Sequence, residues 1–287
     1  MTASVDLSPY GSYPPGGLAR AVLALTRRLP ANWLGLRTSM PLRRLVINRL
    51  GDRPVDTMVW DTRMRLYPSR NSCEKNALFT PQMFDLIEPG VLAAAIGRRL
   101  AEGRTFTFVD IGANVGLYSL FVARLGGPRV RVLAAEPQPG IVDRLRFNLR
   151  ANPDLRIDVL PLAVADRDGE IELVIDQRDA GGTHLNTRVP TSTGAETVSV
   201  RCRPLAAILA DAGISAIDAL KIDIEGAEEL ALAPFLREAP RGLLPRLVLI
   251  EDRPSDWSGD LYGLLRQHGY VEATRSRHNV VFERRAQ

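Results

Sequence analysis

The sequence contains few cysteines and histidines, and it has no long apolar segment. Cys73 and Cys202 are its only cysteines, and their wide separation fits neither a metal-binding nor a redox motif. The three histidines are scattered, so they do not predict a metal centre. No segment approaches the roughly 20 apolar residues that cross a bilayer. We therefore expect no disulfide framework, no metal cage and no transmembrane segment, and two unclustered thiols without a secretory leader favour the cytoplasm.

Lysine is also nearly absent. Of the 37 basic residues, all except Lys75 and Lys221 are arginine. Because arginine serves as the general surface cation, a lysine at an unusual position indicates a use for its titratable ammonium group. The net charge of only +4 does not predict a dedicated nucleic-acid surface, so we expect no nucleic-acid partner.

The chain is long enough for one substantial core and an additional N-terminal part. Its 287 residues are 45% hydrophobic, and we predict an N-terminal extension over residues 1–100 and a cofactor-binding domain over residues 101–287. The extension is expected to comprise a mobile, turn-rich start (8–17), an amphipathic helix (18–29), a basic helix (42–50), a hairpin (55–67) and a helix that caps the core (81–99).

This extension carries a strongly basic stretch. Between Ala19 and Arg53 there are eight arginines and a single acid, Asp52. A basic helix can contact an anionic membrane or an acidic substrate, whereas a solvated face on a capping element is the commoner alternative. The sequence therefore leaves peripheral contact with a membrane as one alternative for this segment.

Residues 106–120, FTFVDIGANVGLYSL, predict a strand, a glycine turn and the start of a helix. The apolar strand reaches Asp110, Gly112 permits a tight turn, and Gly116 allows the next helix to lie close to the sheet. This layout is typical of a loop that binds a nucleotide-like cofactor, although glycines can also serve packing alone.

The next predicted strand, residues 129–135, leads directly into Glu136. An acid at the end of the second strand, about 20 residues after the glycine turn, can accept hydrogen bonds from both hydroxyls of a ribose. The alternative is a solvated charge at a strand end.

The glycine turn also indicates which cofactor is bound. A dinucleotide pattern requires glycines where this chain has Asn114 and Leu117. An asparagine side chain hinders the close approach of a pyrophosphate, but a cofactor with an amino-acid tail needs no such approach. S-adenosylmethionine therefore fits better than NAD, and Asp110 can meet the positively charged amino group of its tail.

Residues 217–225 predict a fourth core strand with one charged face. Lys221, Asp223 and Glu225 alternate there with apolar residues, whereas central parallel strands are normally apolar on both faces. Because ligands of doubly wound sheets bind at the carboxyl ends of the strands, we expect reacting groups on this face. We predict that Asp223 orients or deprotonates an acceptor while Lys221 sets its local charge; a buried ion pair is the structural alternative.

In these segments the sequence resembles the FkbM-like family, a class I group of S-adenosylmethionine-dependent methyltransferases. The likeness covers residues 105–252 and depends on residues 110–116 (DIGANVG), on Glu136 and Pro137 with Asn148 on the following helix, and on residues 221–228 (KIDIEGAE). The resemblance implies a Rossmann-like α/β fold with a mostly parallel, doubly wound sheet. It also implies methyl transfer, usually to a hydroxyl oxygen.

The resemblance assigns roles residue by residue. It implies active-site roles for Lys221, Asp223 and Glu225. The residues expected to bind the cofactor are Asp110, Gly112, Ala113, Asn114, Gly116, Glu136 and Pro137.

Three later residues complete the candidates. Ala163 opens a segment that is expected to border the adenine. His184 lies in a glycine-containing loop (178–186) that is expected to form a lid, where imidazole could help to remove the acceptor's proton. The slightly favoured alternative is that His184 is an ordinary polar loop residue. Glu251 ends a later strand at the ligand side. It could share a divalent ion with Asp223, but no metal site is predicted.

The acceptor itself is not encoded by these motifs. We expect a hydroxyl on a sugar, a glycan or a secondary metabolite. Two alternatives are an N-methyltransferase that acts on nucleic acid or protein and an inactive cofactor-binding module. Amino methyltransferases resemble one another in an Asn/Asp-Pro-Pro-aromatic motif, and here Asp223 is followed by Ile224 and Glu225 instead.

Overall fold

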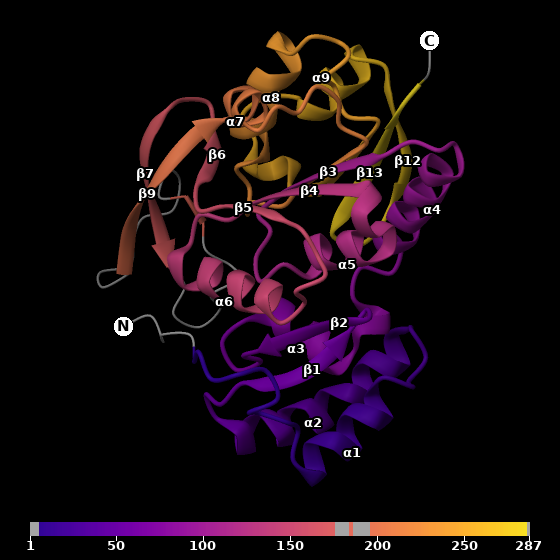
Figure 1. Cartoon of the computed structure of the whole chain (residues 1–287), viewed down its shortest axis with the longest axis vertical. Helices are drawn as coiled ribbons and strands as arrows, with labels where there is room; N and C mark the ends of the chain where they lie inside the picture. The colour runs from indigo at the N-terminus through magenta and orange to yellow at the C-terminus, as the bar shows by residue number, and fades with distance from the viewer. Residues whose placement is uncertain (1–5, 176–183, 186–195, 286–287) are drawn as a thin grey trace.

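The computed structural model describes residues 6–175, 184–185 and 196–285. Figure 1 shows the N-terminal helices and hairpin, coloured indigo to purple, at one end of the molecule and an α/β unit at the other. Within the described residues, no helix combines the length and apolar character needed to span a bilayer.

A seven-stranded sheet forms the centre of the α/β unit, in the order β12-β13-β11-β10-β3-β4-β5. Its five neighbouring strands from β11 to β5 are parallel, and β13 and β12 complete the sheet as an antiparallel hairpin. The strands are β3 (Phe106–Ile111), β4 (Val130–Ala135), β5 (Asp158–Leu160), β10 (Ala219–Ile222), β11 (Leu247–Glu251), β12 (Tyr270–Arg275) and β13 (Asn279–Arg284). The predicted mostly parallel, doubly wound fold is confirmed.

Helices cover both faces of this sheet because the strands are apolar on both faces. In β3, Phe108 points into one hydrophobic cluster and Val109 into the other, as the two-residue period of a strand requires. The first cluster lies under α4 (Glu88–Ala101), α5 (Leu117–Gly126) and α6 (Pro139–Arg150), and the second under α7 (Leu205–Asp211), α8 (Glu228–Glu238) and α9 (Leu261–Gln267).

The N-terminal part packs on the first cluster, which contains its own residues Val46 and Leu78 beside Phe108 of the sheet. Its elements are α1 (Gly17–Thr26), α2 (Trp33–Leu50), β1 (Val55–Val59), β2 (Thr62–Leu66), α3 (Ser72–Phe79) and the 3-10 turn η1 (Pro81–Met83). The predicted first helix and hairpin are present.

Two predicted helices have different bounds. The basic helix begins at Trp33 rather than at residue 42, because the Asn32 side chain caps it by accepting a hydrogen bond from the Gly35 amide at 3.0 Å. The helix predicted over residues 81–99 is interrupted: η1 ends at Met83, and α4 begins only at Glu88.

The turn-rich start that was predicted to be mobile, residues 8–17, makes specific contacts at Ser8 and Pro9. The guanidinium of Arg65, 1% exposed, donates to the carbonyl oxygens of Asp6, Ser8 and Pro9 at 2.9 Å. It also forms a two-pronged pair with Asp56 at 2.7 and 2.8 Å. A turn-rich composition thus does not make the segment loose, because a buried cation from the hairpin satisfies its backbone.

A second, four-stranded sheet has the order β6-β9-β7-β8. It consists of β6 (Ala163–Ala165), β7 (Gly169–Ile175), β8 (His184–Leu185) and β9 (Glu196–Pro204). The backbone of His184 thus belongs to a short strand that pairs with Val174. Residues 178–183 and 186 of the predicted 178–186 lid lie outside the described residues, as does the His184 side chain.

Candidate cofactor and acceptor site

The glycine turn after β3 lies directly against the end of β10. Gly112 has φ +77°, and a Cβ atom there would lie 1.9 Å from the backbone oxygen of Asp223. Gly116 has φ +88°, and its Cβ would lie 2.3 Å from Cδ1 of Leu145 on α6. Both positions therefore require glycine for conformation and for space, which agrees with the predicted turn.

Residues outside the turn hold it in place. Asn114 has φ +51°, and its Oδ1 accepts hydrogen bonds from the Val115 amide at 2.9 Å and from Asn71 of the N-terminal part at 3.0 Å. Asn148 on α6 donates to the Val115 carbonyl at 3.1 Å and accepts from the Arg65 amide at 2.8 Å. The N-terminal part thus supports the turn directly through the Asn71 side chain, and through Asn148, which links Val115 to the Arg65 amide of β2.

Glu136, at the end of β4, is buried beside this turn. Its Oε2 accepts from the Asn114 amide at 2.9 Å, and its Oε1 accepts from the Gln138 amide at 3.0 Å. Burial raises the pKa of Glu136 to about 7, against the lowering effect of these two hydrogen bonds. Each carboxylate oxygen has a second lone pair, so the group can still accept from a diol.

Asp110 and Lys221 are neighbours in register on β3 and β10. Asp110 accepts from Ser119 at 2.6 Å through Oδ2, whereas its buried Oδ1 has no partner among the described residues. Burial raises the pKa of Asp110, although Lys221 opposes this shift. An orphaned carboxylate oxygen of this kind suits the cationic amino group of an amino-acid tail.

Lys221 is buried and paired. Its Nζ donates to Oδ2 of Asp223 at 2.9 Å and lies 5.1 Å from the ring centre of Tyr118. Burial alone would lower the pKa of Lys221, but Asp223 and Asp110 raise it above its ordinary value. The Lys221–Asp223 ion pair, which was the structural alternative to a catalytic role, is therefore present. It is formed by two of the residues that are predicted to have active-site roles.

The predicted charged strand is shorter than expected. β10 ends at Ile222, and Glu225 lies in the following turn with φ +55°. Asp223 follows the strand directly and is held by a hydrogen bond from its amide to the Ile111 carbonyl at 3.0 Å. Its side chain is 37% exposed. Only Lys221 and Asp223 therefore share a face, because the chain turns sharply at Glu225.

Asp223, Glu225 and Glu251 offer carboxylate oxygens that lie within 4.8 Å of one another. Lys221 pairs with Asp223, and Arg253 pairs with Glu225 and lies 3.7 Å from Glu251. Burial and the two neighbouring acids raise the pKa of Glu251 to about 8. Lys221 and Arg253 thus place two positive charges beside these three carboxylates.

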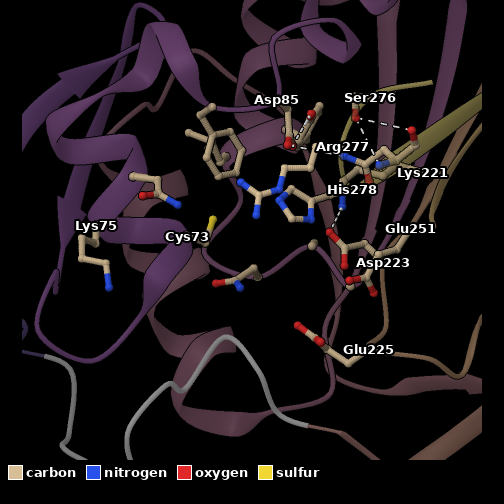
Figure 2. A pocket seen from close by; sticks show the side chains of 18 of the residues that line it. Cys73, Lys75, Asp85, Lys221, Asp223, Glu225, Glu251, Ser276, Arg277 and His278 are labelled. Carbon is tan, nitrogen blue, oxygen red and sulfur yellow. Dashed lines mark hydrogen bonds and ion pairs between the residues drawn. The ribbon is translucent and has the colours of Figure 1, made fainter. Parts of the chain in front are cut away.

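These residues line one continuous cavity of about 1320 Å³. Pockets for one drug-sized ligand have about 300–1,000 Å³, so this cavity can hold a cofactor and a second molecule. Figure 2 shows Lys221, Asp223, Glu225 and Glu251 together on one side of it. The predicted residues that line the cavity are Asp110, Gly112, Ala113, Asn114, Glu136, Pro137, Ala163, Lys221, Asp223 and Glu225; Gly116 packs behind the turn instead.

The rest of the lining comes from parts of the chain that the motifs did not indicate. Residues of α2 and Cys73 and Lys75 of α3 lie on the side away from Glu251, whereas the turn between β12 and β13, with Arg277 and His278, adjoins Glu251 (Figure 2). The sequence contained one usable signal, because Lys75 and Lys221 are the two lysines of the chain. No sequence pattern predicts that residues 276–279 lie opposite α3, since that contact depends on tertiary packing.

Fold and site together define a class I, S-adenosylmethionine-dependent methyltransferase: the parallel sheet carries a glycine turn after β3, a buried acid after β4 and a cavity at its carboxyl edge. Residues 110–272 match the model of the methyltransferase FkbM domain. The chain belongs to this family.

Several curated proteins are similar to this chain. The 31-O-demethyl-FK506 methyltransferase FkbM of Streptomyces tacrolimicus is 32% identical over 56% of this chain and 71% of its own length. The methyltransferase sdnD of Sordaria araneosa is 29% identical over 59% and 74%. The AMB antimetabolite synthetase AmbE of Pseudomonas aeruginosa is 29% identical over 58% of this chain, which spans 10% of that much longer protein.

Solved structures are similar at low identity. The methyltransferase domain of METTL16 has 16% identity and a TM-score of 0.46, covering 92% of this chain and 89% of that domain. A methyltransferase from Aquifex aeolicus that depends on S-adenosylmethionine has 14% identity and a TM-score of 0.42, covering 75% and 96%.

Proposed function

We propose that the protein is an S-adenosylmethionine-dependent O-methyltransferase whose acceptor is a hydroxyl of a sugar, glycan or secondary metabolite. The proposal rests on one observation: Glu136, the glycine turn and Asp223 line the same cavity. We also propose residues 101–287 as the cofactor-binding domain, residues 1–100 as the extension that completes the cavity, and the cytoplasm as its location, since both cysteines are free.

The cofactor roles follow from the chemistry of each group. Glu136 would accept the two ribose hydroxyls, Asp110 would take the amino group of the tail, and Ala163 would border the adenine. The bound cofactor supplies a methyl group on a positively charged sulfur, which any aligned nucleophilic oxygen can attack. The turn over residues 112–116 would lie beside the tail, and it requires Gly112 because a side chain there would collide with the Asp223 backbone oxygen.

The protein's own contribution is positioning and proton control. Asp223 follows the β10 strand at the cavity and is partly exposed, so it can orient an acceptor hydroxyl and receive its proton. Lys221 holds one oxygen of Asp223 and directs the carboxylate toward the cavity. Alignment of two reactants saves roughly 7–11 kcal/mol of barrier, more than a base contributes.

An oxygen acceptor is supported by two observations. The segment after Asp223 lacks the motif of amino methyltransferases, and the name of the similar Streptomyces tacrolimicus protein gives 31-O-demethyl-FK506 as its substrate. We therefore extend O-methylation to this chain as part of the proposal.

Calorimetry followed by a transfer assay tests the proposal. S-adenosylmethionine should bind with clear heat, whereas NAD should not. Incubation with methyl-labelled cofactor and a panel of hydroxyl and amino compounds should then move the label to a hydroxyl compound. Label that stays on the cofactor would indicate a binding module, and transfer to an amine would contradict the oxygen specificity.

A further inference from the structure

The two sides of the cavity differ in charge. On the cofactor side, the acids are matched by partners that include Lys221, Ser119 and Arg253. The lining residues from α2, α3, the segment after η1 and the β12–β13 turn include the cations Arg43, Arg44, Lys75 and Arg277 and one acid, Asp85, which accepts a hydrogen bond from Tyr118 at 2.7 Å. These lining residues therefore carry an excess of positive charge.

These cations have few competing partners. Arg43 is buried and donates to Oδ1 of Asn76 at 2.5 Å, and Lys75 donates to Ser72 at 3.4 Å. For Arg44 and Arg277, no ion pair with an acid is found within the part of the chain that the structure describes. These donors are therefore available for a ligand.

The same wall is also apolar. From α2 it includes Trp33, Leu36 and Met40, which are 71%, 39% and 60% exposed. Phe84 and Leu86, after η1, continue this surface into the cavity. Large apolar side chains beside free cations match a molecule with an apolar body and a negatively charged group.

The positions of the cations limit where that charge can bind. Figure 2 shows the Arg277 side chain extending into the middle of the cavity and Lys75 on the side away from Asp223, Glu225 and Glu251. An anion near the three acids would be repelled, whereas one between Arg277 and Lys75 would be attracted. The apolar residues of α2 would then contact the remainder of the molecule.

We propose that the methyl acceptor is an anionic amphiphile, in which a phosphate or carboxylate is bound by Arg277 and Lys75 and an apolar part lies against α2. This inference names the acceptor class of the proposed methyltransferase and therefore rests on that function. It gives α2, which belongs to the N-terminal extension, a role in contacting the apolar part of the substrate.

Calorimetry with simple probes tests the proposal on the full chain. S-adenosylhomocysteine is titrated first, and octyl phosphate, octyl glucoside, octyltrimethylammonium and inorganic phosphate follow on the loaded protein. Octyl phosphate should bind at least about 10-fold more tightly than each of the other three, because only it offers both the charge and the chain. Equal binding of octyl glucoside would overturn the proposal.

Charge-neutral variants locate the binding. Arg277→Gln and Lys75→Gln should each weaken octyl phosphate binding by about 10-fold, the loss of one charge-assisted hydrogen bond, without changing the affinity for S-adenosylhomocysteine. Arg49→Gln is the matched control, since Arg49 is exposed on α2 but does not line the cavity. Unchanged octyl phosphate affinity in both cavity variants would contradict the proposal.

Two further outcomes have separate meanings. If vesicles rich in phosphatidylglycerol bind the protein but octyl phosphate does not, α2 is a membrane-docking surface and the proposed acceptor is wrong. If S-adenosylhomocysteine produces no heat, the methyltransferase function fails, and titration of octyl phosphate into the free protein then tests the anionic site alone.

Discussion

At the scale of single residues, the account depends on two carboxylates in different surroundings. Asp223 is partly exposed and paired with Lys221, whereas Glu136 is buried and held by two backbone amides. Their surroundings suit different tasks: an accessible carboxylate can take a proton from an acceptor, and a fixed, desolvated one can bind a diol.

Replacement of Asp223 by asparagine should slow methyl transfer by about 10²–10⁴-fold, because a general base contributes this much. The affinity for S-adenosylmethionine should change little, since Lys221 keeps Asp110 as a neighbour. Single-turnover assays and calorimetry measure the two quantities. Asp211→Asn, a surface change at a side chain that is 65% exposed, is the control. Unchanged turnover in the Asp223 variant would remove Asp223 from the mechanism.

The raised pKa of Glu136 predicts a pH-dependent affinity. If the ionised carboxylate accepts from the ribose, affinity should fall by up to about 10-fold from pH 8 to pH 6, because a pKa of about 7 leaves the group mostly protonated at pH 6. Calorimetry in matched buffers measures this dependence. The Glu136→Gln variant should bind more weakly and show a flatter profile.

The raised pKa of Glu136 also determines whether its contribution to the stability of the cofactor-free protein rises or falls with pH. Since the folded-state pKa of Glu136 lies above its ordinary value of 4.5, the folded state binds more protons than the unfolded state between pH 4.5 and about 7. The contribution of Glu136 is therefore fully present below pH 4.5 and is lost as the pH rises through 7. Melting of the wild type and of Glu136→Gln at a series of pH values measures the contribution of Glu136 to stability. A contribution that increases with pH would show that the carboxyl is not buried as described.

At the scale of elements, the strand, turn and helix over residues 106–120 could be predicted from sequence because their signals are local. The apolar strand, the positive-φ glycines and the acid after β4 are each fixed by a few neighbouring residues. The bounds of α2, the break before α4 and the early end of β10 were not predicted, because capping by Asn32 and the turn at Glu225 depend on side-chain geometry.

The glycine turn offers a test at this scale. Gly112→Ala should lower the affinity for S-adenosylmethionine at least about 10-fold, because the new methyl group would meet the Asp223 carbonyl and the backbone has positive φ. Gly97→Ala is a matched control, since a Cβ at Gly97 on α4 meets nothing within 4 Å. Calorimetry compares both variants, and equal affinities would show that the turn does not form the cofactor site.

At the scale of the whole molecule, the N-terminal part and the sheet share a hydrophobic cluster and a cavity. The sequence predicted the cofactor side because its motifs lie at strand ends that meet at one edge of the sheet. It could not predict the acceptor side, since α2, Lys75 and Arg277 come together only through packing between distant segments.

Arg65 connects these parts, so its loss should destabilise the protein as a unit. Arg65→Met leaves the buried Asp56 carboxylate without its cation and should lower the free energy of unfolding by about 3–5 kcal/mol. Arg63→Met, an exposed position on the same strand, should change it by less than about 0.5 kcal/mol. Chemical denaturation of both variants measures the difference, and similar losses would show that the Arg65 network does not anchor the N-terminal part.

The central claim is that the cofactor binds at the carboxyl edge of β3, β4 and β10. A crystal structure with S-adenosylhomocysteine tests it most directly. The account predicts that the ribose hydroxyls donate to Glu136, that the amino group of the tail lies at Asp110, and that the sulfur faces the cavity beside Asp223. An adenosine bound elsewhere, with Glu136 contacting only the amides of Asn114 and Gln138, would contradict the account.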